Sequence, residues 1–297
     1  ENDGSIIFHI DHSPLIKINS NNDLVWILDD IPYHHSIEKD HENNIWVCGR
    51  YFPNKIDEKY VSNEIEDFLN DKEYYDDGIR KISSNGEILF DKSISEIFIE
   101  NGMESLIFGR GMFFKDPIHL NDIQPVLENG EFWKQGDVFL SLRNQSMIML
   151  YRPSNNKIIW YDRGPFSEQH DIDILDNNKI SIFDNNAKRF FNGREVDSTN
   201  NVFVYDFEND NYNKFMYKGI TDLDLRTKSE GRSEILPNGN LYVEESNYGR
   251  SVLFDNYNKP IWVHYNRYGD DLFKVCWSRI IYDSYEVELI KKFLESK

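Results

Sequence analysis

The sequence predicts an all-β fold of the β-propeller class, in which small antiparallel sheets are arranged around a central channel. Two observations lead to this prediction. A short block that begins with a histidine, or with a residue in its place, recurs along the 297 residues, and pairs of strand-like segments lie between the blocks. Recurrence on this scale indicates one supersecondary unit used repeatedly. We therefore expect a single propeller domain over residues 1–297.

The recurring blocks are expected to supply the innermost strands of the blades. Each block runs from its first residue through a strand and a turn into a second β-rich stretch. The four copies span residues 35–47, 119–141, 170–183 and 231–243, and the last has no histidine. Innermost strands begin at the channel. His35, His119 and His170, far apart in the sequence, should therefore converge there.

The outer strands are predicted from five hairpin-like pairs whose turns are rich in Asn, Asp, Gly and Ser. These pairs are 15–18 with 24–28, 79–82 with 88–90, 148–151 with 158–160, 202–205 with 215–217, and 252–254 with 261–263. Five outer pairs predict five blades. Six blades are the alternative, if residues 93–118 contain another one.

The two ends of the chain are expected to complete one blade together. The first outer pair has no inner strands before it, and the strand-like segment 277–282 has no outer pair after it. Their union would close the ring and leave no long sheet edge exposed. Two helices are expected outside the blades, an acidic insertion over 61–75 and a C-terminal helix over 285–294.

The composition limits the classes of partner and compartment. A net charge of −19 argues against nucleic acid as a partner, because that binding depends on clustered Lys and Arg. No run approaches the roughly 18 apolar residues of a membrane span, and the first residues lack the features of a signal peptide. The chain starts at Glu1, so a leader or anchor before it is left open. A disulfide between Cys48 and Cys276 is also left open.

An ordered set of motifs in the middle of the chain resembles the bacterial arylsulfotransferase family. The motifs are His119-Leu120-Asn121-Asp122, residues 141–146 with Arg143, residues 157–160 ending in Trp160, Gln169-His170-Asp171, and Phe183-Asp184-Asn185. The match extends over residues 115–190, and the blade rhythm continues to both ends. The resemblance implies a propeller that moves a sulfuryl group between phenols through a sulfated histidine, without a nucleotide donor. It also implies a periplasmic or secreted protein.

The resemblance places His119 and His170 in the channel and matches Arg189 to the family's active-site arginine. We expect these three residues to be catalytic, with the histidines as acid, base or nucleophile. The family's attacking histidine lies in a later blade. This chain has Gly231-Arg232-Ser233 and Ser278-Arg279 there, and His264 falls on an outer strand. The identity of the nucleophile therefore stays open.

Further polar residues are expected to bind the substrate, a small aryl sulfate or another anion. An arginine fork donates two parallel hydrogen bonds to an oxyanion, which suits the charge that develops in sulfuryl transfer. The expected substrate-binding residues are His35, Asn121, Arg143, Asp171, Arg232 and Arg279. Asp171, Asn121 and Gln169 are expected to fix the tautomers of the channel histidines. His9, His12 and His41 are assigned to the surface or to turns, and Asn185 to a turn.

Several alternatives stay open beside this hypothesis. A histidine at the inner edge of a blade can bond the backbone of the next blade and stabilise the ring without chemistry. The same pocket would also suit a silent propeller that binds an anion, a glycan or a protein, or a different hydrolase or lyase, because fold does not determine chemistry. We expect no resident metal. The alternatives are zinc held by His35, His119, His170 and Asp171, or calcium held by tunnel oxygens.

Overall fold

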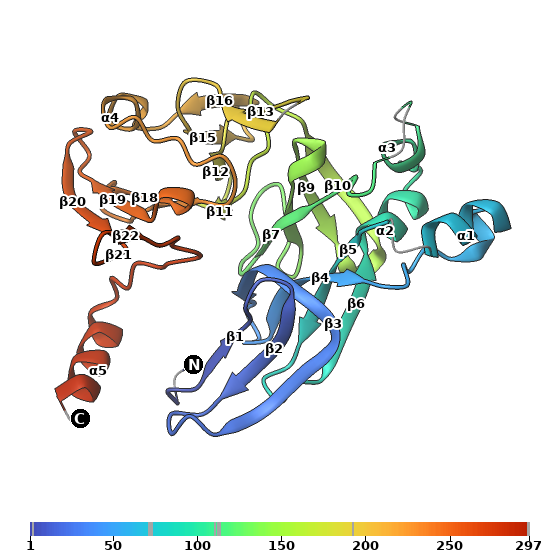
Figure 1. Cartoon of the computed structure of the whole chain (residues 1–297), viewed down its shortest axis with the longest axis horizontal. Helices are drawn as coiled ribbons and strands as arrows, with labels where there is room; N and C mark the ends of the chain where they lie inside the picture. Colours follow the sequence, from blue (N-terminus) through green and yellow to red (C-terminus); the bar gives the residue numbers. More distant parts are fainter. Residues whose placement is uncertain (2, 71–73, 110, 112–113, 192, 296–297) are drawn as a thin grey trace.

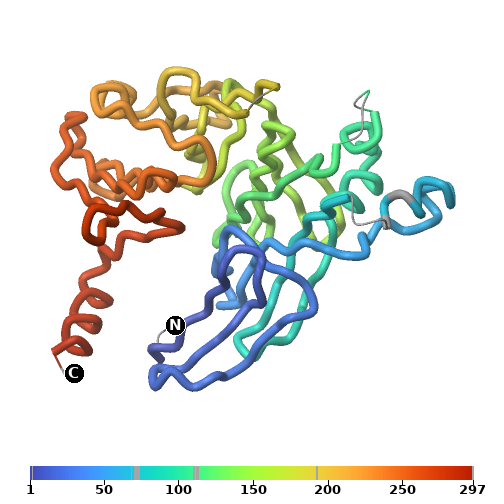
Figure 2. The backbone as a smooth tube through the Cα atoms, viewed as in Figure 1, coloured from blue at the N-terminus to red at the C-terminus, as the bar shows by residue number. Residues whose placement is uncertain are grey.

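The computed structural model describes residues 1, 3–70, 74–109, 111, 114–191 and 193–295. Its strands form an arc of four blades, and α5 (Ser284–Glu295) projects from the end of the chain (Figures 1 and 2). Each blade is an antiparallel sheet whose strands are joined mostly by short turns, so that neighbours in sequence are neighbours in the sheet. The predicted all-β propeller class is confirmed.

Each blade has four strands, numbered outward from the channel except where noted. Blade 1 comprises the second half of β3 (Leu24–Lys39), β4 (Ile45–Tyr51), β5 (Asp76–Ile82) and β6 (Ile88–Ser93); blade 2 comprises β7 (Leu120–Pro125), β8 (Val138–Leu142), β9 (Met147–Arg152) and β10 (Lys157–Asp162); blade 3 comprises β11 (Ile172–Ile174), β12 (Lys179–Asp184), β15 (Asn201–Asp206) and β16 (Asn211–Lys214); blade 4 comprises β17 (Arg232–Ile235), β18 (Leu241–Glu245), β19 (Arg250–Phe254) and β20 (Pro260–Tyr265). Two small hairpins are added, β13 (Ala187–Phe190) with β14 (Gly193–Val196) in blade 3, and β21 (Arg267–Tyr268) with β22 (Asp271–Leu272) after blade 4.

The blade number differs from the predicted five because the first outer pair has no inner strands of its own. The 16-residue strand β3 pairs through its first half with β2 (Ser13–Ile18), which also pairs with β1 (Ile6–Phe8). Through its second half β3 pairs with β4. The N-terminal strands and blade 1 therefore form one six-stranded sheet.

The expected closing strand over 277–282 does not form. The backbone N–H groups of Trp277 and Ser278 donate to the Glu244 carboxylate at 3.2 and 2.7 Å, and Trp277 has a φ of 56°. Backbone donors that bind a side chain cannot also form a ladder. The two ends of the arc meet instead through Arg279, which donates to the carbonyl of Ile37 at 2.9 Å and pairs with Glu38.

Residues 93–118 contain helices where a sixth blade was the alternative. α2 (Ile94–Glu100) starts at a capping box in which Ser93 accepts from the Glu96 backbone and Glu96 accepts from that of Ser93. α3 (Ser105–Phe108) follows. No strand occurs in the described part of this segment, which omits residues 110, 112 and 113.

The other helices agree partly with the sequence. α1 (Asn63–Asn70) lies in the expected insertion, whose residues 71–73 fall outside the described chain, and α5 matches the expected C-terminal helix. The outer strand of blade 3 is β16, four residues before the predicted 215–217. Those residues instead lead into α4 (Tyr217–Asp222).

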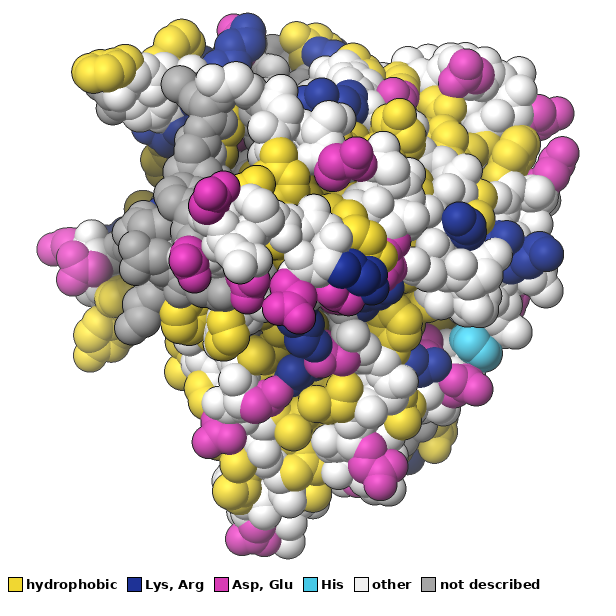
Figure 3. Space-filling model, turned by 90° about the vertical axis from the view of Figure 1, so that its right-hand side faces the viewer, with side chains coloured by type: hydrophobic (Ala, Val, Ile, Leu, Met, Phe, Trp, Pro, Cys, Tyr) yellow, Lys and Arg dark blue, Asp and Glu magenta, His cyan; other side chains and the backbone are white. Residues whose placement is uncertain are grey.

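The hydrophobic core consists of layers between neighbouring blades. One buried cluster joins blade 1 with blade 2 and with α2, the next joins blades 2 and 3, and the third joins blades 3 and 4. Cys48 is buried in the first cluster and Cys276 is exposed, and both thiols are free. The outer face in Figure 3 mixes acidic, basic and hydrophobic side chains. Among the described helices, none has the length and apolarity needed to cross a bilayer.

Side chains near the start of each inner strand link the blades to one another. Ser36 Oγ accepts from the Ile123 N–H at 3.0 Å, and Asp122 Oδ2 accepts from the Ile172 N–H at 2.9 Å. Asp171 Oδ2 accepts from the Ser233 N–H, also at 2.9 Å. We call Ser36, Asp122 and Asp171 the inter-blade ring. These contacts set the spacing of the blades around the channel and so position the residues beside them.

Candidate active site

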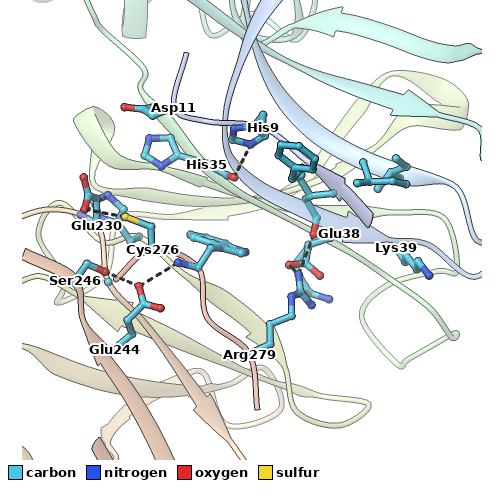
Figure 4. Close-up of a pocket in the computed structure, with 18 of the residues that line it drawn as sticks. His9, Asp11, His35, Glu38, Lys39, Glu230, Glu244, Ser246, Cys276 and Arg279 are labelled. Atoms are coloured by element: carbon cyan, nitrogen blue, oxygen red, sulfur yellow. Dashed lines mark hydrogen bonds and ion pairs between the residues drawn. The ribbon is translucent and has the colours of Figure 1, made fainter. Parts of the chain in front are cut away.

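A pocket of about 1070 Å³ opens where the blades meet the two ends of the chain. His9, Asp11 and His35 line it from the N-terminal sheet, and Glu230 and Cys276 line it from the opposite side (Figure 4). The residues brought together at its centre come from blades 1, 2 and 3, or from their edges: His35, His119, His170, Arg143 and Arg194. The expected convergence of the three histidines is therefore found.

His119 presents one ring nitrogen to the pocket and has the other fixed. Its Nδ1 donates to Asp116 Oδ2 at 2.5 Å. A carboxylate accepts only, so this bond places the proton on Nδ1 and leaves the lone pair on Nε2 of the neutral ring. Burial lowers the pKa of His119 to about 4, although the Asp116 hydrogen bond acts in the opposite direction. At neutral pH the ring is therefore uncharged, with Nε2 as a base or nucleophile.

His35 faces His119 across the pocket. The two Nε2 atoms are 3.3 Å apart, and His35 must be the donor because His119 carries its proton on Nδ1. Both residues have positive φ, 60° for His35 and 50° for His119, which is uncommon outside glycine. The left-handed backbone occurs at the same position of two blocks, where it turns the imidazole toward the channel. Burial holds the pKa of His35 well below its usual value.

His170 is held at both ring nitrogens. Asn185 uses its amide group to donate to the carbonyls of Thr227 and Glu230, so its Oδ1 accepts from His170 Nδ1 at 2.6 Å. His170 Nε2 accepts in turn from the Glu230 N–H at 2.9 Å. Burial lowers the pKa of His170 well below its usual value, so the ring is neutral. This arrangement ties blade 3 to the loop before blade 4.

Three arginines gather around one carboxylate beside His119. Glu168 pairs with both Arg189 and Arg194, and Asn144 Oδ1 accepts from Arg189 at 2.7 Å and from Arg143 at 3.1 Å. Burial, together with the charges of Arg194 and Arg189, lowers the pKa of Arg143 to about 9. The edge of the pocket is therefore electropositive in a chain whose net charge is −19.

Four other residues expected to bind substrate lie away from this arginine cluster. Asn121 donates to the Gln169 carbonyl at 2.9 Å, and Asp171 belongs to the inter-blade ring. Arg232 is buried, donates to the Ser278 carbonyl at 2.6 Å and lies 3.6 Å from Asp171. Arg279 closes the arc on Glu38. These contacts link blades and chain ends.

Sequence reasoning missed several residues of the site. Asp116 and Asn185 hold the tautomers of His119 and His170, a role expected of Asp171, Asn121 and Gln169. Arg194 comes from the β13–β14 hairpin, which interrupts the blade pattern. His9 and His12, assigned to the surface or turns, also line the pocket, and His9 Nε2 donates to the His35 carbonyl at 3.0 Å. No repeat or spacing signal marks these positions.

The groups considered for a metal differ in how far their donors are engaged. Asp77, Asp116 and His119 offer ligand atoms within 4.8 Å of one another, alone among triads of described residues. However, both oxygens of Asp77 already accept from Arg50, and Oδ2 also accepts from the Leu120 N–H. A cation there would have to displace Arg50. In the histidine set proposed from the sequence, His170 and Asp171 are likewise engaged.

Comparison with solved structures supports the fold. A protein of unknown function from Bacteroides caccae superimposes with a TM-score of 0.53 at 12% identity, over 87% of this chain and 77% of the other. The RRP9 WD40 repeats match at 0.47 and 8% identity, and virginiamycin B lyase from Staphylococcus aureus at 0.43 and 11%. This chain covers 89% and 88% of its own length in these two matches, and 60% and 66% of theirs. A search of curated proteins found no match.

The sequence profile of one family matches residues 2–267, which is most of the chain. The match includes all four blades and every residue of the pocket that comes from them. It supports a sulfotransferase-like function in general terms. The chain belongs to the arylsulfotransferase (ASST) family.

Proposed function

We propose that this protein transfers a sulfuryl group from an aryl sulfate to a phenol, with His119 as the nucleophile. The observation that carries the proposal is the position of His119 Nε2. Its lone pair faces the pocket, and a carboxylate holds the opposite nitrogen in the donor tautomer. The same arrangement of a reacting group, a ring and an orienting carboxylate serves other nucleophilic enzymes.

The arginine cluster supports an anionic substrate at this position. Arg143 and Arg194 line the pocket, and Arg189 is joined to them through Asn144 and Glu168. In sulfuryl transfer the protein mainly positions the reactants and stabilises the charge on the non-bridging oxygens. We assign Arg143 and Arg194 to these oxygens and Arg189 to the rim of the site.

The proposed reaction has two displacements. In the first, His119 Nε2 attacks sulfur, the bond from sulfur to the aryl oxygen breaks, and the donor phenol leaves. In the second, the acceptor phenol oxygen attacks sulfur and the N–S bond breaks. The proton lost by the acceptor replaces the one taken up by the first phenol. His35, 3.3 Å from His119, is the nearest group to carry it.

His170 is assigned a positioning role in this scheme. Both of its nitrogens are used within the protein, by Asn185 and by the backbone of Glu230. It therefore has no lone pair or proton to offer a substrate in this arrangement. Its ring forms part of the wall against which His35 lies, with ring centroids 5.7 Å apart.

The experiment is turnover of 4-nitrophenyl sulfate with phenol as acceptor, comparing the native chain with His119→Gln. We expect His119→Gln to lose at least about 10³-fold in kcat/KM, because the nucleophile is removed. Peptide mass spectrometry of the native chain, quenched after mixing with donor alone, should find sulfate on His119. His264→Gln is the matched control, because His264 is exposed on β20.

Two results would contradict the proposal in different ways. Unchanged turnover in His119→Gln would reject this nucleophile. Absence of turnover in the native chain with several aryl sulfates, combined with measurable binding of the same compounds, would favour a propeller that binds anions without chemistry.

A further inference from the structure

A second use of the His35–His119 pair follows from the distance between its nitrogens. Two imidazole nitrogens bound to one tetrahedral zinc, each at about 2.0–2.1 Å, lie about 3.3–3.4 Å apart. His35 Nε2 and His119 Nε2 are 3.3 Å apart, and both residues line the pocket. We propose that His35 and His119 together bind a divalent transition metal of the zinc class at this point of the pocket.

The surroundings of His119 match those of a metal-bound histidine. Such ligands usually donate the other ring N–H to a carboxylate, which fixes the tautomer and leaves the lone pair toward the metal. Asp116 accepts from His119 Nδ1 in this way. His35 must then move its proton from Nε2 to Nδ1, which is a change of tautomer without a change of charge.

The pocket supplies what the two histidines lack. A catalytic-type zinc site keeps an open position for water or an anion, and this pocket is large enough to hold both. A third imidazole lies beside the pair, since the ring of His34 is 5.0 Å from that of His35 and 6.3 Å from that of His119. His34 is fully buried, and neither of its nitrogens has a hydrogen-bond partner among the described residues.

The site differs from the Asp77–Asp116–His119 group in the state of its donors. Occupation of that group would break the hydrogen bonds of Arg50 and Leu120 to Asp77. Occupation of the His35–His119 site replaces one N–H···N hydrogen bond between neutral rings. It leaves the Asp116 contact intact as the outer shell of the metal.

The test is titration of the metal-stripped full chain with ZnCl₂ in a calorimeter, repeated with CoCl₂ and read by visible absorption. We expect one zinc per chain and an intense cobalt spectrum of the tetrahedral type. His35→Gln and His119→Gln should each weaken zinc binding by more than about 10-fold, and Asp116→Asn by about 10-fold. His41→Gln, in an exposed turn, should bind as the native chain does.

Some outcomes would overturn the inference. If the native chain binds no zinc up to millimolar concentration, the two rings share only a hydrogen bond. If the His35 and His119 variants bind zinc as tightly as the native chain, the metal lies elsewhere. Asp116→Asn keeps both ligands, so it tests the site even where a histidine variant fails to fold. None of these results depends on sulfuryl transfer.

Discussion

The mouth of the pocket and the inter-blade ring are built from the same repeated blocks, yet their side chains are in opposite states. His35 and His119 open their blocks and share one hydrogen bond at the pocket surface. Ser36, Asp122 and Asp171, one to three residues further along, are buried and accept from the next blade. A shift of a few residues along a strand thus separates a group that can react from one that holds the fold.

Asp171→Ala should break the ring half of this comparison most strongly. The change removes the acceptor of the Ser233 N–H and leaves Arg232 buried without its 3.6 Å partner. Breaking one side of a buried ion pair costs about 3–5 kcal/mol of unfolding free energy. Urea denaturation at pH 7 measures this, with Asp11→Ala at an exposed position as the control. A loss below about 1 kcal/mol would remove Asp171 from the ring.

The pH dependence of stability should also identify the ring. Burial raises the pKa of Asp171 to about 6; Glu38 and Glu244 also raise it, whereas Arg232 and the Ser233 N–H lower it. Asp122 and Asp173 repel the same carboxylate. Because the folded pKa is the higher one, the stabilising contribution is complete below about pH 3.8 and is lost as pH rises through 6.

We therefore expect the native chain to lose about 3 kcal/mol relative to Asp171→Asn between pH 4 and 7. Urea denaturation of both chains at several pH values between 4 and 7 gives the difference, in which the other titrating groups cancel. A constant difference across this range would show that Asp171 keeps an ordinary pKa in the folded protein.

The two matched histidines should separate by stability. His170→Ala leaves Asn185 Oδ1 and the Glu230 N–H without their partner, and one such buried loss costs about 2 kcal/mol. His119→Ala should change the unfolding free energy by less than about 1 kcal/mol, because its remaining contacts border the pocket. Thermal and urea unfolding of the two variants would test this order. The reverse order would place the structural histidine in blade 2.

Arg194→Gln should have the smallest effect, confined to the mouth. Its guanidinium lines the pocket and pairs with Glu168, so its loss removes one contact to an anionic donor. We expect KM for the aryl sulfate to rise about 10-fold, equivalent to about 1.4 kcal/mol, with a smaller change in kcat. Arg226→Gln, exposed and paired with Asp224, is the control. A fall in kcat alone would instead assign Arg194 to the transition state.

The fold was largely predictable because hairpins and blocks are local patterns. Four of the five predicted outer pairs occur where expected, and the blocks do supply inner strands. The blade number was not predictable, because it depends on whether residues 277–282 pair with backbone or with the Glu244 side chain. The helix after Ser93 did carry a signal, the Ser93–Glu96 capping box, but the apolar residues around it also suit a strand.

The site was predictable only in its histidines. His35, His119 and His170 share a place in a repeat, and a repeat fixes their position. Their partners Asp116 and Asn185 lie in loops whose conformation depends on tertiary contacts, so sequence reasoning assigned the tautomer-fixing role to other residues. It is these partners that distinguish an open His119 from a closed His170.

The contact between Arg279 and Glu38 joins positions 241 residues apart. Blades formed from consecutive hairpins can fold as soon as each segment of the chain is available, whereas this contact must wait for the last part of it. The pocket has the same history, since its walls include His9 and His35 from the beginning of the chain and Trp277 and Arg279 from near its end. The catalytic mouth should therefore be the last part of the protein to exist during synthesis, which would keep a growing chain inactive until the whole ring is present.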